Sequence, residues 1–422
     1  MILTKKVRIN PSEVVKRTLW EISYLCKDLW NMALEQRKNR NAWGHVNVYT
    51  QKKELPDLKK AYPEFKAPAS QVLQNVLFDL DASYQMFFTK WKGGDQEVRP
   101  PRFKSWRQFM RQRYSQRNVC FVIEETTLKL AYGSKKGDWL ELELPVGSYG
   151  SVKTVDIIYD NREKKWYACM TYQVAEAPVK TEGEVIYFDP GCKTALTGIK
   201  TPGEFVEYDL NPLRELNKST YVLIDTLLSQ RDHKKKGSYH WKRLNQRIKR
   251  LFRKIRTRSQ NYLHKLSKTI LSDHPDVRTF CIGNWKQKET LGDTDYAYVN
   301  RRINRAVQNN NPLEELIGYL TYKGKLRGQW VKRFDERGST RGCCACDHVH
   351  VEGIPPHKRV FDCEKCGFRY SRDHQSCLNF VKRNEPALWR CLFGDLPDRS
   401  MRVGLNPFSF KPWRRDYSLV VS

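Results

Sequence analysis

The chain has 422 residues and carries 76 lysines and arginines against 47 aspartates and glutamates, a net charge of +29. That length allows about two to four domains with a sizeable core. The charge favours a nucleic-acid partner over an anionic membrane surface. The sequence lacks an apolar run of bilayer length and a signal-peptide core, so we expect no membrane partner. Its cysteines combine one metal-type cluster with scattered single thiols, which fits a reducing compartment.

The first 180 residues predict helices enclosed between β segments. Residues 2–9 predict a strand, and Ser12 then opens a helix of apolar residues at helical spacing. A second amphipathic helix runs over about 70–91 and ends at Gly93. Short alternating runs then predict five strands, at 120–123, 127–131, 139–144, 152–159 and 166–174. A small barrel or sandwich fits this pattern.

Basic and aromatic side chains alternate between the second helix and these strands, from Arg99 to Arg117. The mixture suits phosphate contact with base stacking, and it suits a solvated basic face equally well. Our candidates for nucleic-acid contact in this segment are Arg102, Lys104 and Trp106.

From residue 184 onward the pattern alternates between strands and helices. A strand, tight turn and strand occupy 184–199, and further strands are predicted at 277–282 and 329–334, with helices over 213–272 and 298–323. Strand–helix–strand units imply parallel pairing. Residues 231–258 contain thirteen lysines and arginines against the single acid Asp232, which predicts a helix face lying against something anionic. Lys249 and Arg253 are our candidate contacts there.

Two cysteine pairs near the C-terminal end have the spacing of a structural zinc ribbon, with four thiolates for one Zn²⁺ ion. Each pair has two residues between its members, and sixteen residues separate the pairs. The expected ligands are Cys343, Cys346, Cys363 and Cys366. Cys344 would leave a one-residue gap, which zinc knuckles rarely use, and we interpret His348, His350 and His357 as loop residues.

Carboxylates stand at the ends of predicted elements on both sides of the ribbon. Asp189 ends the first strand of this half, Glu336 follows the last, and Asp373 heads the helix after the ribbon. Three such groups from separate elements would hold two Mg²⁺ ions, which activate water in phosphodiester hydrolysis, as an RNase H-like nuclease domain requires. The alternatives are a turn-initiating Asp189 and an exposed Glu336 paired with Arg337 or Arg341.

These pieces resemble the TnpB proteins, which are transposon-encoded RNA-guided nucleases, and their relatives, the Fanzor proteins and the miniature type V CRISPR effectors. The matching stretches are SQVLQNVLFDLDASYQMFF, PPRFKSW, FDPGCKTALTG, YLHKLS, DERGST, CEKCG and SRDHQSCLNF, within about residues 1–383. The resemblance implies a Mg²⁺-dependent DNA endonuclease whose partners are a guide RNA and target double-stranded DNA. Base pairing would read the sequence, and the protein would recognise a short adjacent motif.

The resemblance also implies a multidomain α+β architecture. A β-barrel (wedge) domain would be interrupted by a helical recognition lobe, and a split RuvC nuclease domain of the RNase H-like α/β class would carry the ribbon. The expected parts are the wedge at 1–10 and 100–180, the lobe at 11–99, the RuvC domain at 181–340 and 368–385, the ribbon at 341–367, and a tail without assigned role at 386–422. We expect a monomer, in the cytoplasm or nucleoid of a prokaryote or the nucleus of a eukaryote.

One position departs from the family's commoner pattern, in which the middle strand ends in a metal-binding glutamate. Here Gly283 and Asn284 stand instead. In one interpretation the carboxylate has moved to Glu336, since parallel neighbours lie about 5 Å apart. In the other the nuclease is dead and the chain is an RNA-guided DNA-binding repressor. The presence of Asp189 and Asp373 favours the first. A zinc-ribbon accessory protein that binds DNA without RNA is a third hypothesis, and it leaves the basic helix unexplained.

Overall fold

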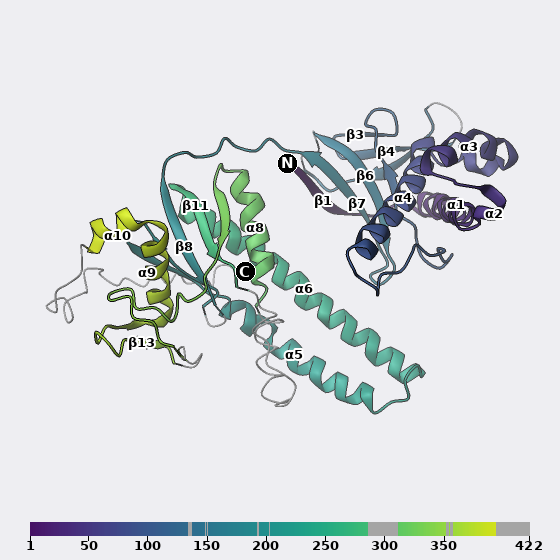
Figure 1. Ribbon diagram of the computed structural model, residues 1–422. Helices are drawn as coiled ribbons and strands as arrows, with labels where there is room; N and C mark the ends of the chain where they lie inside the picture. The colour runs from purple at the N-terminus through teal and green to yellow at the C-terminus, as the bar shows by residue number, and fades with distance from the viewer. Residues whose placement is uncertain are drawn as a thin grey trace. The chain divides into compact units, whose positions relative to one another are not determined.

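A computed structural model of the protein divides it into two compact units, Met1–Ala175 and Glu176–Ser422 (Figure 1). The structure describes residues 1–133, 137–147, 149, 151–191, 194–201, 203–285, 311–351, 354 and 358–393. Both units combine helices with β-sheet, so the fold is multidomain and mixed α/β. No helix in these ranges is both long and apolar enough to cross a membrane.

The first unit contains two antiparallel sheets, one ordered β1-β7-β6-β2 and the other β3-β4-β5. The strands are β1 (Ile2–Ile9), β2 (Gln112–Tyr114), β3 (Phe121–Glu124), β4 (Thr127–Ala131), β5 (Trp139–Glu143), β6 (Val152–Asp160) and β7 (Lys165–Gln173). Strand β1 pairs with β7 along its whole length, from Ile2 opposite Gln173 to Ile9 opposite Trp166. The N-terminal strand therefore joins a sheet built from residues more than a hundred positions later. The sequence predicted each of these strands except the short β2.

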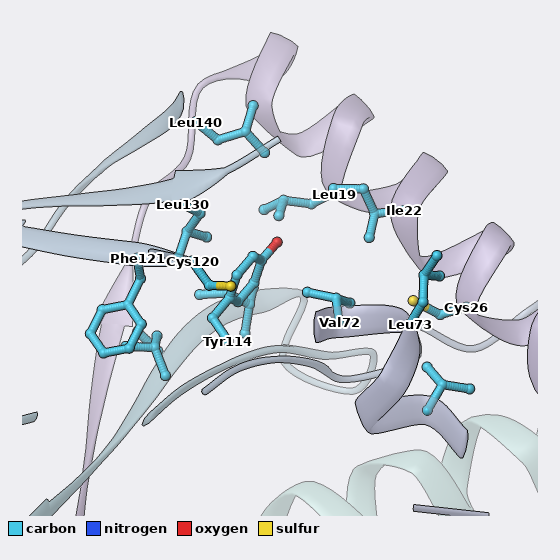
Figure 2. Packing of buried hydrophobic residues seen from close by; sticks show 14 of the residues in the cluster. Leu19, Ile22, Cys26, Val72, Leu73, Tyr114, Cys120, Phe121, Leu130 and Leu140 are labelled. Atoms are coloured by element: carbon cyan, nitrogen blue, oxygen red, sulfur yellow. The ribbon is translucent and has the colours of Figure 1, made fainter. Parts of the chain in front are cut away.

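Helices of the first unit pack on these sheets. They are α1 (Glu13–Lys38), α2 (Arg40–Trp43), α3 (Val48–Ala61), the 3₁₀ helix η1 (Pro63–Lys66) and α4 (Ser70–Lys92). Helix α1 begins where predicted because the Ser12 side chain accepts a hydrogen bond from the Val15 backbone N–H. Its buried face, including Leu19 and Ile22, packs with Leu73 of α4 and Tyr114 of β2 (Figure 2).

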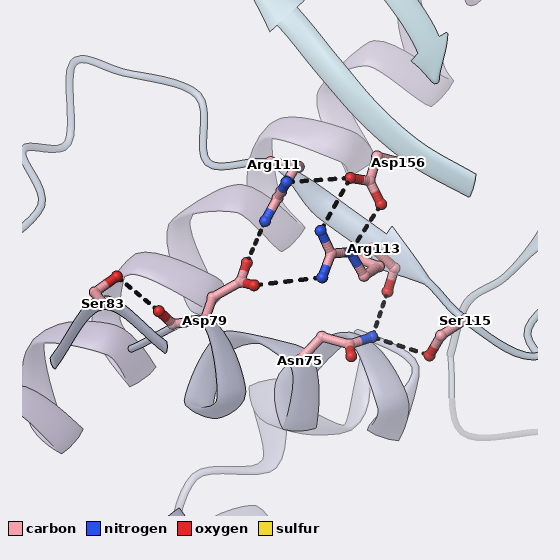
Figure 3. A network of polar contacts seen from close by, with 7 residues as sticks. All are labelled: Asn75, Asp79, Ser83, Arg111, Arg113, Ser115 and Asp156. Carbon is pink, nitrogen blue, oxygen red and sulfur yellow. Dashed lines mark hydrogen bonds and ion pairs between the residues drawn. The ribbon is translucent and has the colours of Figure 1, made fainter. Parts of the chain in front are cut away.

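Two arginines of the basic segment serve the fold. Arg111 and Arg113 each contact Asp79 of α4 and Asp156 of β6, at N–O distances of 2.6 to 3.5 Å (Figure 3). Asn75 of α4 donates to the Arg113 carbonyl at 3.0 Å. This network ties α4 to the four-stranded sheet, so these two arginines are paired with carboxylates of the fold itself.

The second unit is built on a five-stranded sheet with the order β10-β9-β8-β11-β12. The strands are β8 (Glu184–Pro190), β9 (Leu196–Lys200), β10 (Glu204–Tyr208), β11 (Val277–Gly283) and β12 (Trp330–Phe334). Strands β8, β9 and β10 are antiparallel neighbours, whereas β11 runs parallel to both β8 and β12. The predicted parallel pairing is confirmed. Strand β10 was not predicted.

Helices cover both faces of this sheet. They are α5 (Asn211–Asp232), α6 (Tyr239–Asp273), α8 (Leu313–Lys325), α9 (Arg372–Asn384) and α10 (Pro386–Phe393). Ile186 and Phe188 of β8 pack in a core with α5, α6 and α8, while Val185 and Tyr187 pack with α9. A strand buried on both faces reads as a continuous apolar run, which is why β8 was visible in the sequence.

The predicted helical region at 213–272 is two helices, α5 and α6, which run side by side in Figure 1 and are joined through residues 233–238. Ile224 and Leu227 of α5 pack against Ile248 and Ile255 of α6. Of the helix predicted at 298–323, residues 298–310 lie outside the described residues, as do residues 394–422 of the predicted tail. Helix α10 lies where no pattern was found.

Gly198 in β9 tests the packing of this sheet. A Cβ there would lie 2.5 Å from Cδ1 of Phe188, so Gly198→Ala is expected to lower the free energy of unfolding by about 1–3 kcal/mol. Gly318 in α8 is the control, because its Cβ position is open among the described residues, and Gly318→Ala should raise that free energy by about 0.5–1 kcal/mol. Urea denaturation measures both. A Gly198→Ala protein as stable as wild type would contradict the packing.

Candidate active site and metal centre

Three parallel strands of the second unit end at one edge of its sheet. Phe188 of β8 lies opposite Ile282 of β11, and Gly283 lies opposite Phe334, the last residue of β12. Asp189 and Gly283 therefore stand at one level, and Glu336 follows two residues after β12 ends.

The carboxylate of Glu336 reaches across to the middle strand. A Cβ built on Gly283 would lie 2.1 Å from Oε2 of Glu336, so that carboxylate fills the space of the side chain that Gly283 lacks. Gly283 does not adopt a left-handed φ, which means that space, and not the backbone, requires glycine there. Oε2 is buried and accepts no hydrogen bond from the described residues. Such an oxygen is costly unless a cation or a proton meets it.

The three acids predicted from the sequence come together at this edge. Burial raises the pKa of Asp189 well above its usual range, and the nearby carboxylates of Glu336 and Asp373 raise it further, against a hydrogen bond from Ser376. Burial also raises the pKa of Glu336 to about 7. A buried carboxylate beside two others needs a proton or a cation to remain there.

Asp373 has a cationic neighbour that the sequence did not reveal. The guanidinium of Arg359 forms an ion pair with the Asp373 carboxylate, and the Arg359 carbonyl accepts a 2.9 Å hydrogen bond from the backbone of Arg372. Arg359 precedes β13 (Val360–Asp362), which pairs with β14 (Arg369–Ser371) immediately before α9. The Arg359–Asp373 ion pair forms because the chain folds back between β13 and β14. No residue spacing in 358–373 predicts that fold. Ser376, by contrast, lies one helical turn after Asp373 and could have been found from that spacing.

The four predicted zinc ligands also come together. Within the described part of the chain they are the one group of three or more Cys, His, Asp or Glu residues whose ligand atoms all lie within 4.8 Å. The Sγ atoms of Cys343 and Cys366 are 3.7 Å apart, and those of Cys346 and Cys363 are 3.6 Å apart. Four thiolates about 2.3 Å from a tetrahedral Zn²⁺ would be separated by about 3.8 Å. The cluster therefore fits a zinc site, whereas the three carboxylates are spaced more widely.

Neighbouring candidates fall outside this cluster. Cys344 is buried against α9 in a different core. His350 approaches Glu364 through Nδ1 at 3.5 Å. His348 stacks edge-on with His350, and His357 lies outside the described residues.

The predicted nucleic-acid contacts of the first unit lie in one segment whose backbone is held by α1. Lys27 donates through Nζ to the carbonyls of Trp106 and Gln108 at 2.9 and 3.0 Å, and the Trp30 indole N–H donates to the Arg102 carbonyl at 3.0 Å. Trp106 is 68% exposed. The backbone of the segment is thus anchored, and the side chains of Arg102 and Trp106 are exposed.

Lys249 and Arg253 belong to α6 of the second unit. Lys249 is exposed and Arg253 is half-buried. These two residues belong to a different unit from Arg102, Lys104 and Trp106.

Residues 314–380, which include the acidic edge after β12 and the cysteine cluster, match a family model described as Cas12f1-like, TNB domain. The chain is 24% identical over 394 residues to InsQ of Escherichia coli (strain K12), whose name describes an RNA-guided DNA endonuclease, covering 91% of this chain and 92% of that protein. It is 25% identical over 421 residues to a similarly named protein of Streptomyces pristinaespiralis, covering 97% and 96%.

A solved Cas12f1–sgRNA–target DNA complex has a protein chain of similar fold, with a TM-score of 0.59 at 12% identity, covering 90% of this chain and 98% of that one. The chain is thus similar in sequence to two proteins named as RNA-guided DNA endonucleases and similar in fold to Cas12f1, and its residues 314–380 match a Cas12f1-like TNB domain. This confirms the resemblance drawn from its sequence.

Zinc content tests the ligand set. Cys363→Ser is expected to lose the bound zinc and lower the thermal stability of the ribbon, because three thiolates close a structural site poorly. Cys344→Ala is the matched control and should keep about one zinc per chain. Elemental mass spectrometry of the purified proteins measures both. Loss of zinc in Cys344→Ala with retention in Cys363→Ser would overturn the assignment.

Proposed function

We propose that the protein is an RNA-guided DNA endonuclease that hydrolyses DNA at the site of Asp189, Glu336 and Asp373. The observation that carries this proposal is the Glu336 carboxylate over Gly283, beside Asp189 and in the place where a side chain of the middle strand would stand. The names of the two bacterial relatives support the same activity. The guide RNA and target DNA would be its partners, in whichever compartment holds the DNA.

We further propose the domain assignment that the sequence suggested. A sheet with three antiparallel strands followed by two parallel ones is the RNase H-like order, which supports a RuvC domain at 181–340 and 368–385 with the zinc ribbon at 341–367. The wedge would be 1–10 and 100–180 and the lobe 11–99, so that all but residues 176–180 of these two parts lie in the first unit. The part of 386–422 that the structure describes contains α10, and we assign it no role.

The acidic residues present fit Mg²⁺. Hard carboxylate oxygens are the ligands this ion prefers, and the buried, unpaired Oε2 of Glu336 is an oxygen without a partner among the described residues. When bound there, two ions would activate water and stabilise the leaving oxygen. Asp189, Glu336 and Asp373 would hold them. Ser376 orients Asp189 by hydrogen bonding, and Arg359 brings a positive charge to the same edge.

The alternative is a guided repressor without catalysis. It was raised by the glycine at position 283, and the position of Glu336 weakens it. A carboxylate whose pKa is raised to about 7 by burial is costly to keep in a site that has no use for it. The sequence also allowed Glu336 to be an exposed turn residue. The buried Oε2 of Glu336 argues against that interpretation.

Carboxylate removal tests the site. Asp189→Ala and Glu336→Gln are each expected to reduce cutting of a guide-matched DNA to background, because each removes a metal ligand while RNA and DNA binding persist. Gel analysis of cleavage and a filter-binding assay measure the two. Cutting by Glu336→Gln at the wild-type rate would mean that Glu336 is not the third ligand. Target occupancy by the wild type without products in Mg²⁺ or Mn²⁺ would establish the repressor.

A swap makes the test sharper. Glu336→Gly combined with Gly283→Glu returns the carboxylate to the middle strand, and should recover part of the activity that Glu336→Gly alone loses. The new side chain would occupy the volume that Glu336 vacates, provided that Cδ of Pro190, 2.9 Å from the Cβ position, moves slightly. A folded double variant that cuts no better than Glu336→Gly would contradict a shared metal position.

The Mg²⁺ requirement should depend on pH. The pKa values of Asp189 and Glu336 are raised, the latter to about 7, so protons compete with metal as the pH falls through that value. Between about pH 8 and about pH 6, the Mg²⁺ concentration for half-maximal cutting is expected to rise. Metal titrations at several pH values measure this, with RNA binding as the control. An unchanged requirement would contradict protonation at the site.

A further inference from the structure

The first unit contains a basic pocket that the proposed chemistry does not use. It has a volume of about 590 Å³ and lies where β1 ends, α1 begins and β6 turns into β7. Its charged lining comprises Arg8, Lys16, Arg17, Lys164 and Lys165, with Glu13 as the one acid. These residues come from three separate elements. The positive charge is therefore brought together by the fold and does not come from one local run of the sequence.

Most of that charge is not neutralised by the protein. Lys16 pairs with Glu13 at 2.6 Å. Arg8, Arg17, Lys164 and Lys165 have no carboxylate partner within the described residues. Four unpaired cations around one concavity repel each other, and an anion in the pocket would relieve that repulsion.

The turn that supplies two of the lysines is rigid. Oδ1 of Asp160 accepts hydrogen bonds from the backbones of Arg162 and Glu163 at 2.8 and 3.1 Å, and the Lys164 N–H donates to the Asp160 carbonyl at 2.7 Å. Lys164 has a φ of 54°, in the left-handed region where a lysine costs about 1 kcal/mol relative to glycine. Lys164 thus occupies a position at which the backbone conformation favours glycine. The hydrogen bonds of the turn hold its backbone in place before any ligand binds.

Aromatic rings form the other wall. Trp20 and Tyr159 line the pocket and are partly exposed, and Trp166 closes it from the buried side. The ring centroids of Trp20 and Tyr159 are 5.5 Å apart, and those of Phe109 and Trp166 are 4.9 Å apart, both pairs edge-to-face. This packing holds the rings in place, which suits stacking of a flat ligand at low entropic cost.

We propose that this pocket binds one unpaired nucleotide of the RNA strand, with its phosphate between Arg17 and Lys164 and its base against Trp20 and Tyr159. Phosphate and a flat base match the two walls, and the volume is that of a pocket for a small organic ligand. A base must be splayed out of a helix to enter a concavity, which single-stranded loops of RNA allow and a duplex does not. The inference rests on the proposed function, because that function supplies the RNA.

Crosslinking within the intact complex tests this pocket. The full chain is expressed with its guide RNA, Tyr159 is replaced by a photoreactive phenylalanine analogue, and the crosslinked nucleotide is mapped after irradiation. We expect one unpaired RNA nucleotide. Arg17→Gln with Lys164→Asn, in which asparagine tolerates the left-handed φ, should lower the crosslink yield about tenfold. The matched control, Arg17→Lys with Lys164→Arg, keeps the charge and should keep the yield. Thermal unfolding confirms that each variant is folded.

Several outcomes would overturn the pocket. They are a yield unaffected by charge removal in a folded variant, crosslinks to paired nucleotides or to the DNA strands, and crosslinks to protein alone. Cutting by the same crosslinkable complex, with only Tyr159 replaced, is measured in parallel. A complex that holds RNA and cuts its target but gives no RNA crosslink overturns the pocket and leaves the proposed function standing. A complex that crosslinks RNA but never cuts contradicts the nuclease and supports the pocket. A chain that holds no RNA overturns both.

Discussion

The crowding of carboxylates around the buried Asp189 is the constraint on which the sheet edge of the second unit depends. Asp189, Glu336 and Asp373 reach the sheet edge from β8, from the residues after β12 and from α9. Bringing them together raises the pKa of Asp189 through burial and through its two neighbours. Keeping such a cluster lowers the stability of the fold, and bound cations would offset that cost. The sheet, its flanking helices and the ribbon can all be understood as supports for that edge.

The glycine at position 283 changes how this edge is built. Because β11 lies between β8 and β12, a side chain on β11 would stand in the middle of the edge. Glu336 approaches that place from the next strand, and glycine leaves the room for it. Metal binding would depend on where the carboxylate oxygen lies, whichever residue supplies it. In the function we propose, the acid at position 336 takes the place of the one that position 283 lacks.

Features set by local patterns were predictable from the sequence, and features set by tertiary pairing were not. Strand β8 is buried on both faces and Ser12 caps α1, so both could be read locally. The cysteine spacing likewise placed the four thiols together. The pairing of Arg359 with Asp373, and of Arg111 with Asp79 and Asp156, follows from the folded path of the chain. Helix α3 was missed because Pro56 interrupts its pattern, and α10 because eight residues give too short a period.

The central claim is that divalent ions bind to the oxygens of Asp189, Glu336 and Asp373. Anomalous diffraction from crystals of the RNA-bound protein grown with Mn²⁺ in place of Mg²⁺ would test it most directly. The account predicts two anomalous peaks at this edge, with oxygens of all three residues about 2.0–2.4 Å from an ion. Saturating Mn²⁺ without a peak there, or peaks whose ligands exclude Glu336, would contradict it.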